Sequence, residues 1–277
     1  MSDRTDHIAQ NKKILDLASK LQIPSAKAPA EVWYVLSSKL TGPTKLVKIH
    51  VWMRVAASIS VIYITFYLLY QAFDVTVVTH GAQRKEVALP DHSKVLLNVE
   101  SALHYNQLSW MLSRSLKFEG EGYFEVAKGS VFTVNSSNGT TQVLGTSFNI
   151  YSRDEDYRVS CSSGRVQVDM PSKSQQILTA GLSTNNLGES TITKPFKESH
   201  VFGWKRGEFY FESQPLSSVF TTIERQYNVK ISSPKIDLTR RYTGFFTNKD
   251  IDEALKVVCL PMGISYKIID TNNIRIY

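Results

Sequence analysis

The sequence predicts a single-pass membrane protein with a short α-helical arm before the span and two folded modules after it. Three observations predict this fold class: an uncharged apolar stretch, a series of short alternating strand patterns, and a strand–helix–strand pattern that occurs twice near the C-terminus. The expected parts are a cytoplasmic arm at 1–54, a transmembrane helix at 55–73, a juxtamembrane linker at 74–84, an all-β domain at 85–185, a second linker at 186–202, and an α+β domain of βαβ-βαββ order at 203–277.

The apolar stretch 55–73 holds 19 residues without a charge. A helix of that length spans about 28 Å, close to the thickness of a bilayer's hydrocarbon core. A core helix or a long buried strand is the alternative. The flanks favour a span, because basic residues crowd its N-terminal side and the aromatic residues Trp52 and Tyr70 stand near its two ends. A cleaved signal peptide fits poorly, since a long polar segment precedes the stretch.

The charge distribution predicts the orientation of the span. Residues 1–54 carry nine Lys and Arg against four Asp and Glu, whereas residues 74–277 carry 23 against 21. The positive-inside rule therefore places the N-terminus in the cytoplasm and the large C-terminal part on the other side of the membrane. A pI of 9.2 could suggest nucleic acid, but most of the excess charge is this topology signal, so we expect no direct nucleic-acid binding.

The arm holds two short amphipathic helices. Apolar residues recur at helical spacing from Ile14 to Leu21, Pro24 ends that pattern, and Pro29 can begin a second helix. Two helices this short bury little surface against each other, so their apolar faces need a partner. The alternatives are a self-packed hairpin or an arm lying on anionic lipid. The candidate binding residues are Ile14, Leu17, Leu21, Trp33, Leu36 and Leu40.

Short strands separated by Gly, Asn, Asp and Ser turns predict the all-β domain. The stretch 89–98 has a turn at Asp91-His92, where histidine tolerates the left-handed region better than most residues. The stretch 131–152 carries an Asn138-Gly139 hairpin signal. The stretch 157–170 repeats that arrangement around Ser163-Gly164, so we expect a second hairpin there.

Two amphipathic helices organise the C-terminal module. Pro215 stands at the first position of one, and Asp250 with Glu253 forms a capping box before the other. The expected buried faces are Leu216, Val219, Phe220, Ile223 and Tyr227 in the first helix and Ile251, Ala254, Leu255, Val258 and Cys259 in the second.

No residue pattern indicates catalysis or a cofactor. Four histidines fall after the span, in different predicted elements and without metal-ligand spacing. No serine or cysteine stands in a recognisable nucleophile context. Cys161 and Cys259 could form a disulfide in an oxidising compartment, but in separate domains they are better explained as two buried small apolar residues. We therefore expect a protein that binds partners, not an enzyme.

Several motifs resemble those of FecR-type anti-sigma regulators of Gram-negative envelopes, in the form common in the Bacteroidetes. The matching stretches are Leu89–Asn98, Gly120–Lys128, Val143–Ile150, Ser163–Val168, Trp204–Leu216, Glu224–Tyr227, Gly244–Phe246, Glu253–Leu255 and Gly263–Tyr266. His92 and Gly122 depart from the usual residues of these motifs, and Gln214 replaces the better helix cap that is common in the family. The resemblance covers about 85–277; the arm is similar only through Trp33 and its short helices.

The resemblance implies a relay of signals across the envelope. The arm would hold an extracytoplasmic-function sigma factor. The C-terminal module, which looks like the short N-terminal domain of secretins and TonB-dependent receptors, would meet the periplasmic signalling domain of a transporter for iron or another nutrient. The residues assigned to that contact are Phe209, Phe211, Tyr242 and Phe245. Stepwise cleavage by site-1 and site-2-type proteases would release the sigma factor. The alternative is a structural scaffold of an envelope transport or secretion assembly.

Overall fold

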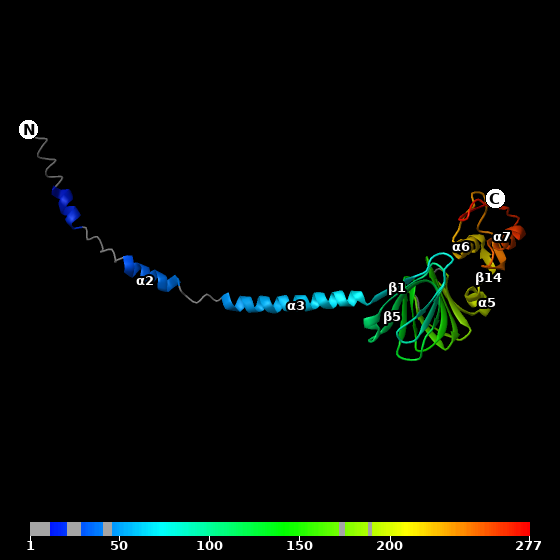
Figure 1. Ribbon diagram of the computed structural model, residues 1–277, viewed down its shortest axis with the longest axis horizontal. Coiled ribbons are helices and arrows are strands. Elements are labelled where there is room, and N and C mark those ends of the chain that lie inside the picture. The colour runs from blue at the N-terminus through cyan, green and yellow to red at the C-terminus, as the bar shows by residue number, and fades with distance from the viewer. Residues whose placement is uncertain (1–11, 21–28, 41–45, 172–174, 188–189) are drawn as a thin grey trace, which may run out of the picture. The chain divides into compact units, whose positions relative to one another are not determined.

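The computed structural model describes residues 12–20, 29–40, 46–171, 175–187 and 190–277 (Figure 1). The chain divides into two compact units, Met1–Thr65 and Phe66–Tyr277, which we describe separately. The boundary falls within the long helix α3, so the first unit holds the arm and most of that helix. The second unit holds the end of the helix and everything after it.

The arm is helical at residues 12–19 and again in α2 (Pro29–Leu40). The long helix α3 (Leu46–Ala72) includes a stretch, His50–Ala72, that is long and apolar enough to cross a membrane, with a mean hydropathy of 1.6. The helix itself begins at Leu46, upstream of Val55, where the predicted span at 55–73 starts. Nothing between these residues breaks a helix, since the nearest proline, Pro43, lies upstream.

Thirteen strands form the β domain (residues 74–195), and they make two sheets. The strands are β1 (Asp74–Val78), β2 (Lys85–Ala88), β3 (Lys94–Leu97), β4 (Ala102–Asn106), β5 (Arg114–Glu125), β6 (Phe132–Ser136), β7 (Gly139–Val143), β8 (Ser147–Arg153), β9 (Asp156–Ser163), β10 (Arg165–Asp169), β11 (Gln176–Thr179), β12 (Leu182–Leu187) and β13 (Ser190–Pro195). One sheet has the order β1-β4-β5-β6-β7-β10-β11 and the other β2-β3-β5-β8-β9-β12-β13.

The long strand β5 belongs to both sheets. Its first half pairs with β4 and β6, and its second half pairs with β3 and β8. The strand changes sheet at Gly120, which has a φ of 106°, and a Cβ atom there would collide with Ser101. Only glycine fits this position without strain.

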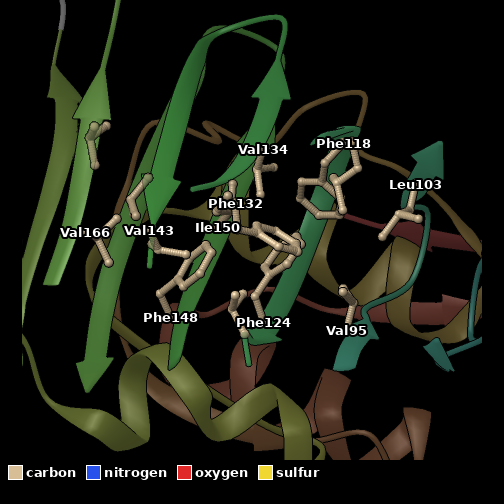
Figure 2. Packing of buried hydrophobic residues seen from close by; sticks show 14 of the residues in the cluster. Val95, Leu103, Phe118, Phe124, Phe132, Val134, Val143, Phe148, Ile150 and Val166 are labelled. Atoms are coloured by element: carbon tan, nitrogen blue, oxygen red, sulfur yellow. The ribbon is translucent and has the colours of Figure 1, made fainter. Parts of the chain in front are cut away.

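The two sheets enclose one apolar core (Figure 2). Phe124 lies at its centre, with its ring stacked on Phe148 at 5.1 Å and in edge contact with Phe118 at 5.2 Å. All three rings are fully buried. Offset and edge contacts of this kind stabilise the core beyond the area they bury.

The structure contains one of the two predicted hairpins. The Asn138-Gly139 hairpin is confirmed, since β6 and β7 pair across it. The hairpin at Ser163-Gly164 is wrong, because β9 lies in one sheet and β10 in the other. Gly164 has a φ of 82°, and the chain crosses there from sheet to sheet. The expected left-handed conformation of His92 is confirmed by its φ of 66°.

Both predicted linkers contain strands instead. Residues 74–78 form β1, which pairs with β4 and places Val75 and Val77 against the core. The hairpin of β12 and β13 occupies most of 182–195, and α5 (Glu198–Phe202) follows it. The outer strands β1 and β13 form edges of their sheets, where one side lacks a neighbouring strand.

The C-terminal domain (residues 198–277) has two small sheets. After α5 come η1 (Gly203–Arg206), β14 (Glu208–Pro215), α6 (Leu216–Tyr227), β15 (Lys230–Ser232), β16 (Arg241–Thr247), α7 (Ile251–Cys259), η2 (Leu260–Met262), β17 (Tyr266–Ile268) and β18 (Asn273–Ile276). Strand β14 pairs with β16, while β18 lies between β15 and β17. Each sheet therefore combines strands from both halves of the domain.

The predicted inner faces of α6 and α7 are confirmed. Eight of the ten expected residues are buried, and Tyr227 and Ile251 are partly buried against the same core. Asp250 caps α7 by accepting hydrogen bonds from the backbone N–H groups of Asp252 and Glu253. Helix α6 begins at Leu216, one residue later than predicted, and Pro215 occupies its cap position. Cys161 and Cys259 are free thiols, and both are buried in separate cores, as predicted for small apolar side chains.

Candidate partner-binding sites

The arm exposes its apolar residues. Every side chain that the structure describes in its two helices, at 12–20 and 30–40, is exposed. The predicted binding residues are exposed by 63% at Ile14, 62% at Leu17, 70% at Trp33, 46% at Leu36 and 74% at Leu40, and Leu21 lies outside the described residues. Trp33, Leu36 and Leu40 share one face of α2 through their i, i+3, i+7 spacing. Leaving such side chains in water is unfavourable, so this face suits a partner.

The four aromatic residues assigned to the transporter contact do not share a surface. Phe209 and Tyr242 are buried in the C-terminal core, Phe211 is partly buried, and only Phe245 is exposed, by 52%. Strand register explains this result. Phe209 pairs with Phe246, and both point into the core, whereas the next pair, Tyr210 and Phe245, points to the opposite face. The assignment of Phe209 and Tyr242 to a binding surface is therefore wrong.

Phe245 belongs to a surface stack that we call the aromatic ladder, made of the partly buried His200 and Tyr210 and the exposed Phe245. The ring centres of His200 and Tyr210 lie 5.4 Å apart, and those of Tyr210 and Phe245 lie 5.5 Å apart, both in stacked orientation. Sequence reasoning missed His200 and Tyr210. The alternation of Glu208, Tyr210 and Glu212 along β14 could have revealed the outward position of the tyrosine.

Charged residues border the aromatic ladder. Arg206 donates a hydrogen bond to Glu208 at 2.9 Å, and this bond holds the pKa of the Glu208 carboxyl below its usual value. On the other side, Glu212 lies 3.8 Å from both Lys197 and His200. An apolar centre with a charged border is the usual composition of a protein–protein interface.

A polar network joins the C-terminal domain to the β domain. Trp204 donates its indole N–H to Asn149 at 3.1 Å, and Asn149 donates to Glu121 at 3.3 Å. Arg84 donates to Gln226 at 3.1 Å and to Asn98 at 3.3 Å. Burial lowers the pKa of the Arg84 guanidinium, and the Glu121 carboxylate opposes that shift.

The network has apolar and charged neighbours. Tyr123 of the β domain packs edge-on against Phe202 at 5.4 Å, and the Lys205 ammonium lies 3.4 Å from the centre of the Tyr123 ring. Arg225 forms an ion pair with Glu100 at 3.2 Å. A contact that combines buried aromatics with satisfied polar groups fixes one relative position of the two domains.

The described residues contain no group of three or more His, Cys, Asp or Glu side chains arranged to hold a metal. The candidate sites among them are the exposed apolar face of α2 and the aromatic ladder. Comparison with known proteins identifies the family. Residues 75–167 match the family model described as FecR protein, and residues 208–276 match the one described as FecR, C-terminal, so that the two together cover more than half of the chain. The chain belongs to the FecR family.

The comparison with solved structures gives a second similarity. The FecR-family chain is similar to a candidate anti-sigma factor from Parabacteroides distasonis ATCC 8503, known from two crystal structures, at 29% sequence identity. At 1.65 Å resolution the match has a TM-score of 0.67 and covers 73% of this chain and 98% of that one; at 2.50 Å the values are 0.68, 74% and 98%. No curated protein matches the chain.

The binding surfaces fall in different parts of this FecR-family protein. The FecR match holds the β-domain side of the interdomain network, including Asn98, Glu121 and Asn149. The C-terminal match holds Tyr210 and Phe245 of the aromatic ladder. The exposed face of α2 precedes both matches.

Proposed function

We propose that this FecR-family protein is a transmembrane anti-sigma regulator that acts by binding, without catalysis. It would relay a signal from a TonB-dependent outer-membrane transporter to a cytoplasmic extracytoplasmic-function sigma factor. The observation that carries the proposal is the combination of the two FecR matches with an arm whose described apolar side chains are all exposed. The candidate anti-sigma factor from P. distasonis supports the same function.

The charge pattern supports the orientation of the protein. The basic arm would lie in the cytoplasm, α3 would cross the inner membrane once, and the β and C-terminal domains would lie in the periplasm. In this arrangement the face of α2 would cover an apolar surface of the sigma factor and prevent its use by RNA polymerase. Helix-in-groove binding of this type depends on anchors at i, i+3 and i+7.

The aromatic ladder would receive the signalling domain of the transporter. The exposed ring of Phe245 and the partly exposed ring of Tyr210 supply an apolar centre, and Arg206, Glu208 and Glu212 supply charged partners around it. The C-terminal domain is also connected to the residues that follow β1, because Ala82 donates its N–H to the carbonyl of Arg225 at 3.0 Å, beside the polar network. Strand β1 follows α3 directly, so a disturbance of the C-terminal domain would reach the segment beside the membrane, where site-1 and site-2-type proteases would act.

Trp33→Ala tests the arm. We expect this substitution to weaken binding of the sigma factor by about 2 kcal/mol, because a buried aromatic anchor contributes that much to an interface. Isothermal titration of the full chain in detergent with the purified sigma factor would measure the change. Tyr34→Ala is the matched control. Tyr34 is adjacent to Trp33 and similarly exposed, at 77% against 70%, but it lies off the face that Trp33 shares with Leu36 and Leu40. Equal losses in the two variants would contradict the assignment of this face.

Phe245→Asp tests the aromatic ladder. We expect an unchanged melting temperature, since Phe245 is exposed, and about a tenfold or greater loss of affinity for the transporter's signalling domain. Ile269→Asp is the control, because Ile269 has the same exposed fraction, 52%, but follows β17 in the other small sheet. A loss of affinity in Ile269→Asp alone would place the contact on that sheet instead. A loss in neither variant would mean that the signalling domain binds elsewhere.

A further inference from the structure

A short apolar turn follows β4 and remains exposed in the β domain. It comprises α4 (Gln107–Trp110) and the two residues after it, and its side chains Leu108, Met111 and Leu112 are exposed by 37%, 87% and 92%. No charged residue occurs between His104 and Arg114. We call the segment 107–112 the apolar turn, and Leu108, Met111 and Leu112 are its exposed apolar side chains. Large apolar side chains this exposed are unusual on a folded domain and indicate a binding surface.

The backbone of the apolar turn is held firmly. Trp110 is buried, and its ring makes edge contacts with Tyr105 at 5.4 Å and Phe132 at 5.6 Å. Asn106 caps α4 by accepting hydrogen bonds from the N–H groups of Leu108 and Ser109, both at 3.0 Å. The turn therefore projects its apolar side chains from a fixed base.

Hydrogen bonds attach this turn to the end of the candidate membrane span. Gln107 donates its backbone N–H to the carbonyl of Phe73 at 2.9 Å. The side-chain amide of Asn106 donates to the carbonyl of Tyr70 at 2.8 Å and to the Asp74 carboxylate at 2.7 Å. Tyr70 and Phe73 stand where a membrane-spanning helix leaves the hydrocarbon, so residues bonded to them lie at the level of the bilayer surface.

Two further exposed apolar residues lie at the same edge of the sheet. Arg114, which begins β5, is opposite Phe132 of β6, and Phe132 is opposite Val143 of β7. The neighbouring residues Val131 and Leu144 are exposed by 50% and 62%. Val131 and Leu144 therefore extend the exposed apolar surface of the apolar turn along the neighbouring ends of β5, β6 and β7.

We propose that the apolar turn inserts into the surface of the lipid bilayer beside α3 and forms a second membrane contact of the β domain. The inference rests on α3 as a membrane span and is independent of sigma-factor binding. A bilayer is the favoured partner because the turn is uncharged, apolar and bonded to the helix where it leaves the hydrocarbon. Side chains of this type enter the interface region with their apolar parts in the lipid. The contact would hold this edge of the β domain against the membrane.

Site-specific fluorescence on the full chain in phosphatidylcholine vesicles tests the proposal. Cys161 and Cys259 are first replaced by alanine, and a single cysteine carrying an environment-sensitive fluorophore is placed at Met111, Glu155 or Ile62. Glu155 is the control for water exposure, since its turn lies at the opposite end of the sheet, where Asn138 donates to the carbonyl of Asp154 at 2.9 Å. Ile62 reports on the span itself.

We expect an aqueous ionic quencher to act about tenfold less on the fluorophore at position 111 than at position 155, because charged solutes are excluded from lipid. A nitroxide placed near the lipid headgroup should quench position 111 and leave position 155 bright. Equal aqueous quenching at 111 and 155, with position 62 shielded, would overturn the membrane contact and leave the span intact. Aqueous quenching at position 62 would overturn both.

A second variant guards against an effect of the probe. In the background Met111→Asp with Leu112→Asp, a fluorophore at Leu108 should become accessible to the aqueous quencher, while the melting temperature of the β domain stays unchanged because both replaced side chains are exposed. Continued shielding at position 108 would contradict insertion of the turn.

Discussion

Asp91→Ala is expected to lower the free energy of unfolding of the β domain by about 3–5 kcal/mol, because it leaves a buried guanidinium without its counter-charge. Arg114 donates to Asp91 at 2.9 Å, and the two side chains are only 9% and 13% exposed. Asp91 also accepts two hydrogen bonds from Ser93, at 3.2 Å to its N–H and 2.8 Å to its hydroxyl. The carboxylate therefore fixes its own turn and the start of β5 together.

Urea unfolding of the full chain in detergent, followed by tryptophan fluorescence, would measure this loss; Trp110 reports from the β-domain core. Asp91→Asn is the matched variant, since its amide oxygen can still accept from Arg114 and the Ser93 hydroxyl while the counter-charge is lost, and we expect it to cost about 2–4 kcal/mol. Equal and small effects of the two variants would show that the ion pair contributes little to the fold.

Trp204→Ala is expected to destabilise the C-terminal domain by about 3–5 kcal/mol and to release it from the β domain. Trp204 is buried in the C-terminal core, and its indole N–H is bonded to Asn149 across the interface. Truncation removes a large buried ring and leaves the Asn149 carbonyl without this donor. The two domains would then unfold in separate steps.

Differential scanning calorimetry would detect the separation. We expect one transition for the wild-type C-terminal region and β domain together, and two transitions for Trp204→Ala. Trp204→Phe keeps most of the apolar contact and loses the hydrogen bond, so it should cost about 1–2 kcal/mol. A single transition at an unchanged temperature in Trp204→Ala would contradict the role of this residue in holding the domains together.

Apolar periodicity was sufficient to predict the two long helices of the C-terminal domain, α6 and α7. The faces of α6 and α7 bury the residues that their spacing indicates, because a helix is defined by contacts close in sequence. The Asn138-Gly139 hairpin is predictable for the same reason, since its two strands are joined by the turn that sets their register.

Pairing between distant strands could not be predicted in this way. The segment 74–78 becomes a strand only because β4, almost thirty residues later, is available beside it at the edge of the sheet. The turn at Gly164 has the sequence of a hairpin, yet it connects two sheets. In both cases the tertiary arrangement decides the structure, and local sequence does not contain that information.

The two candidate binding surfaces differ in how far local sequence specifies them. The exposed face of α2 follows from helical spacing alone. The ladder on β14 and β16 depends on which of two alternating faces points inward, and residue type cannot distinguish Phe209 from Tyr210, because aromatic side chains occur on both faces of this sheet. His200 reaches the ladder from α5, which was expected to be linker.

The most direct test of the central claim is affinity capture of the tagged full chain from membranes of the native cell, with mass spectrometry of the proteins that copurify. An anti-sigma regulator should recover an extracytoplasmic-function sigma factor, and deletion of residues 1–40 should abolish that recovery while keeping the basic residues that orient the span. Capture without a sigma factor, or equal recovery after the deletion, would contradict the proposed function.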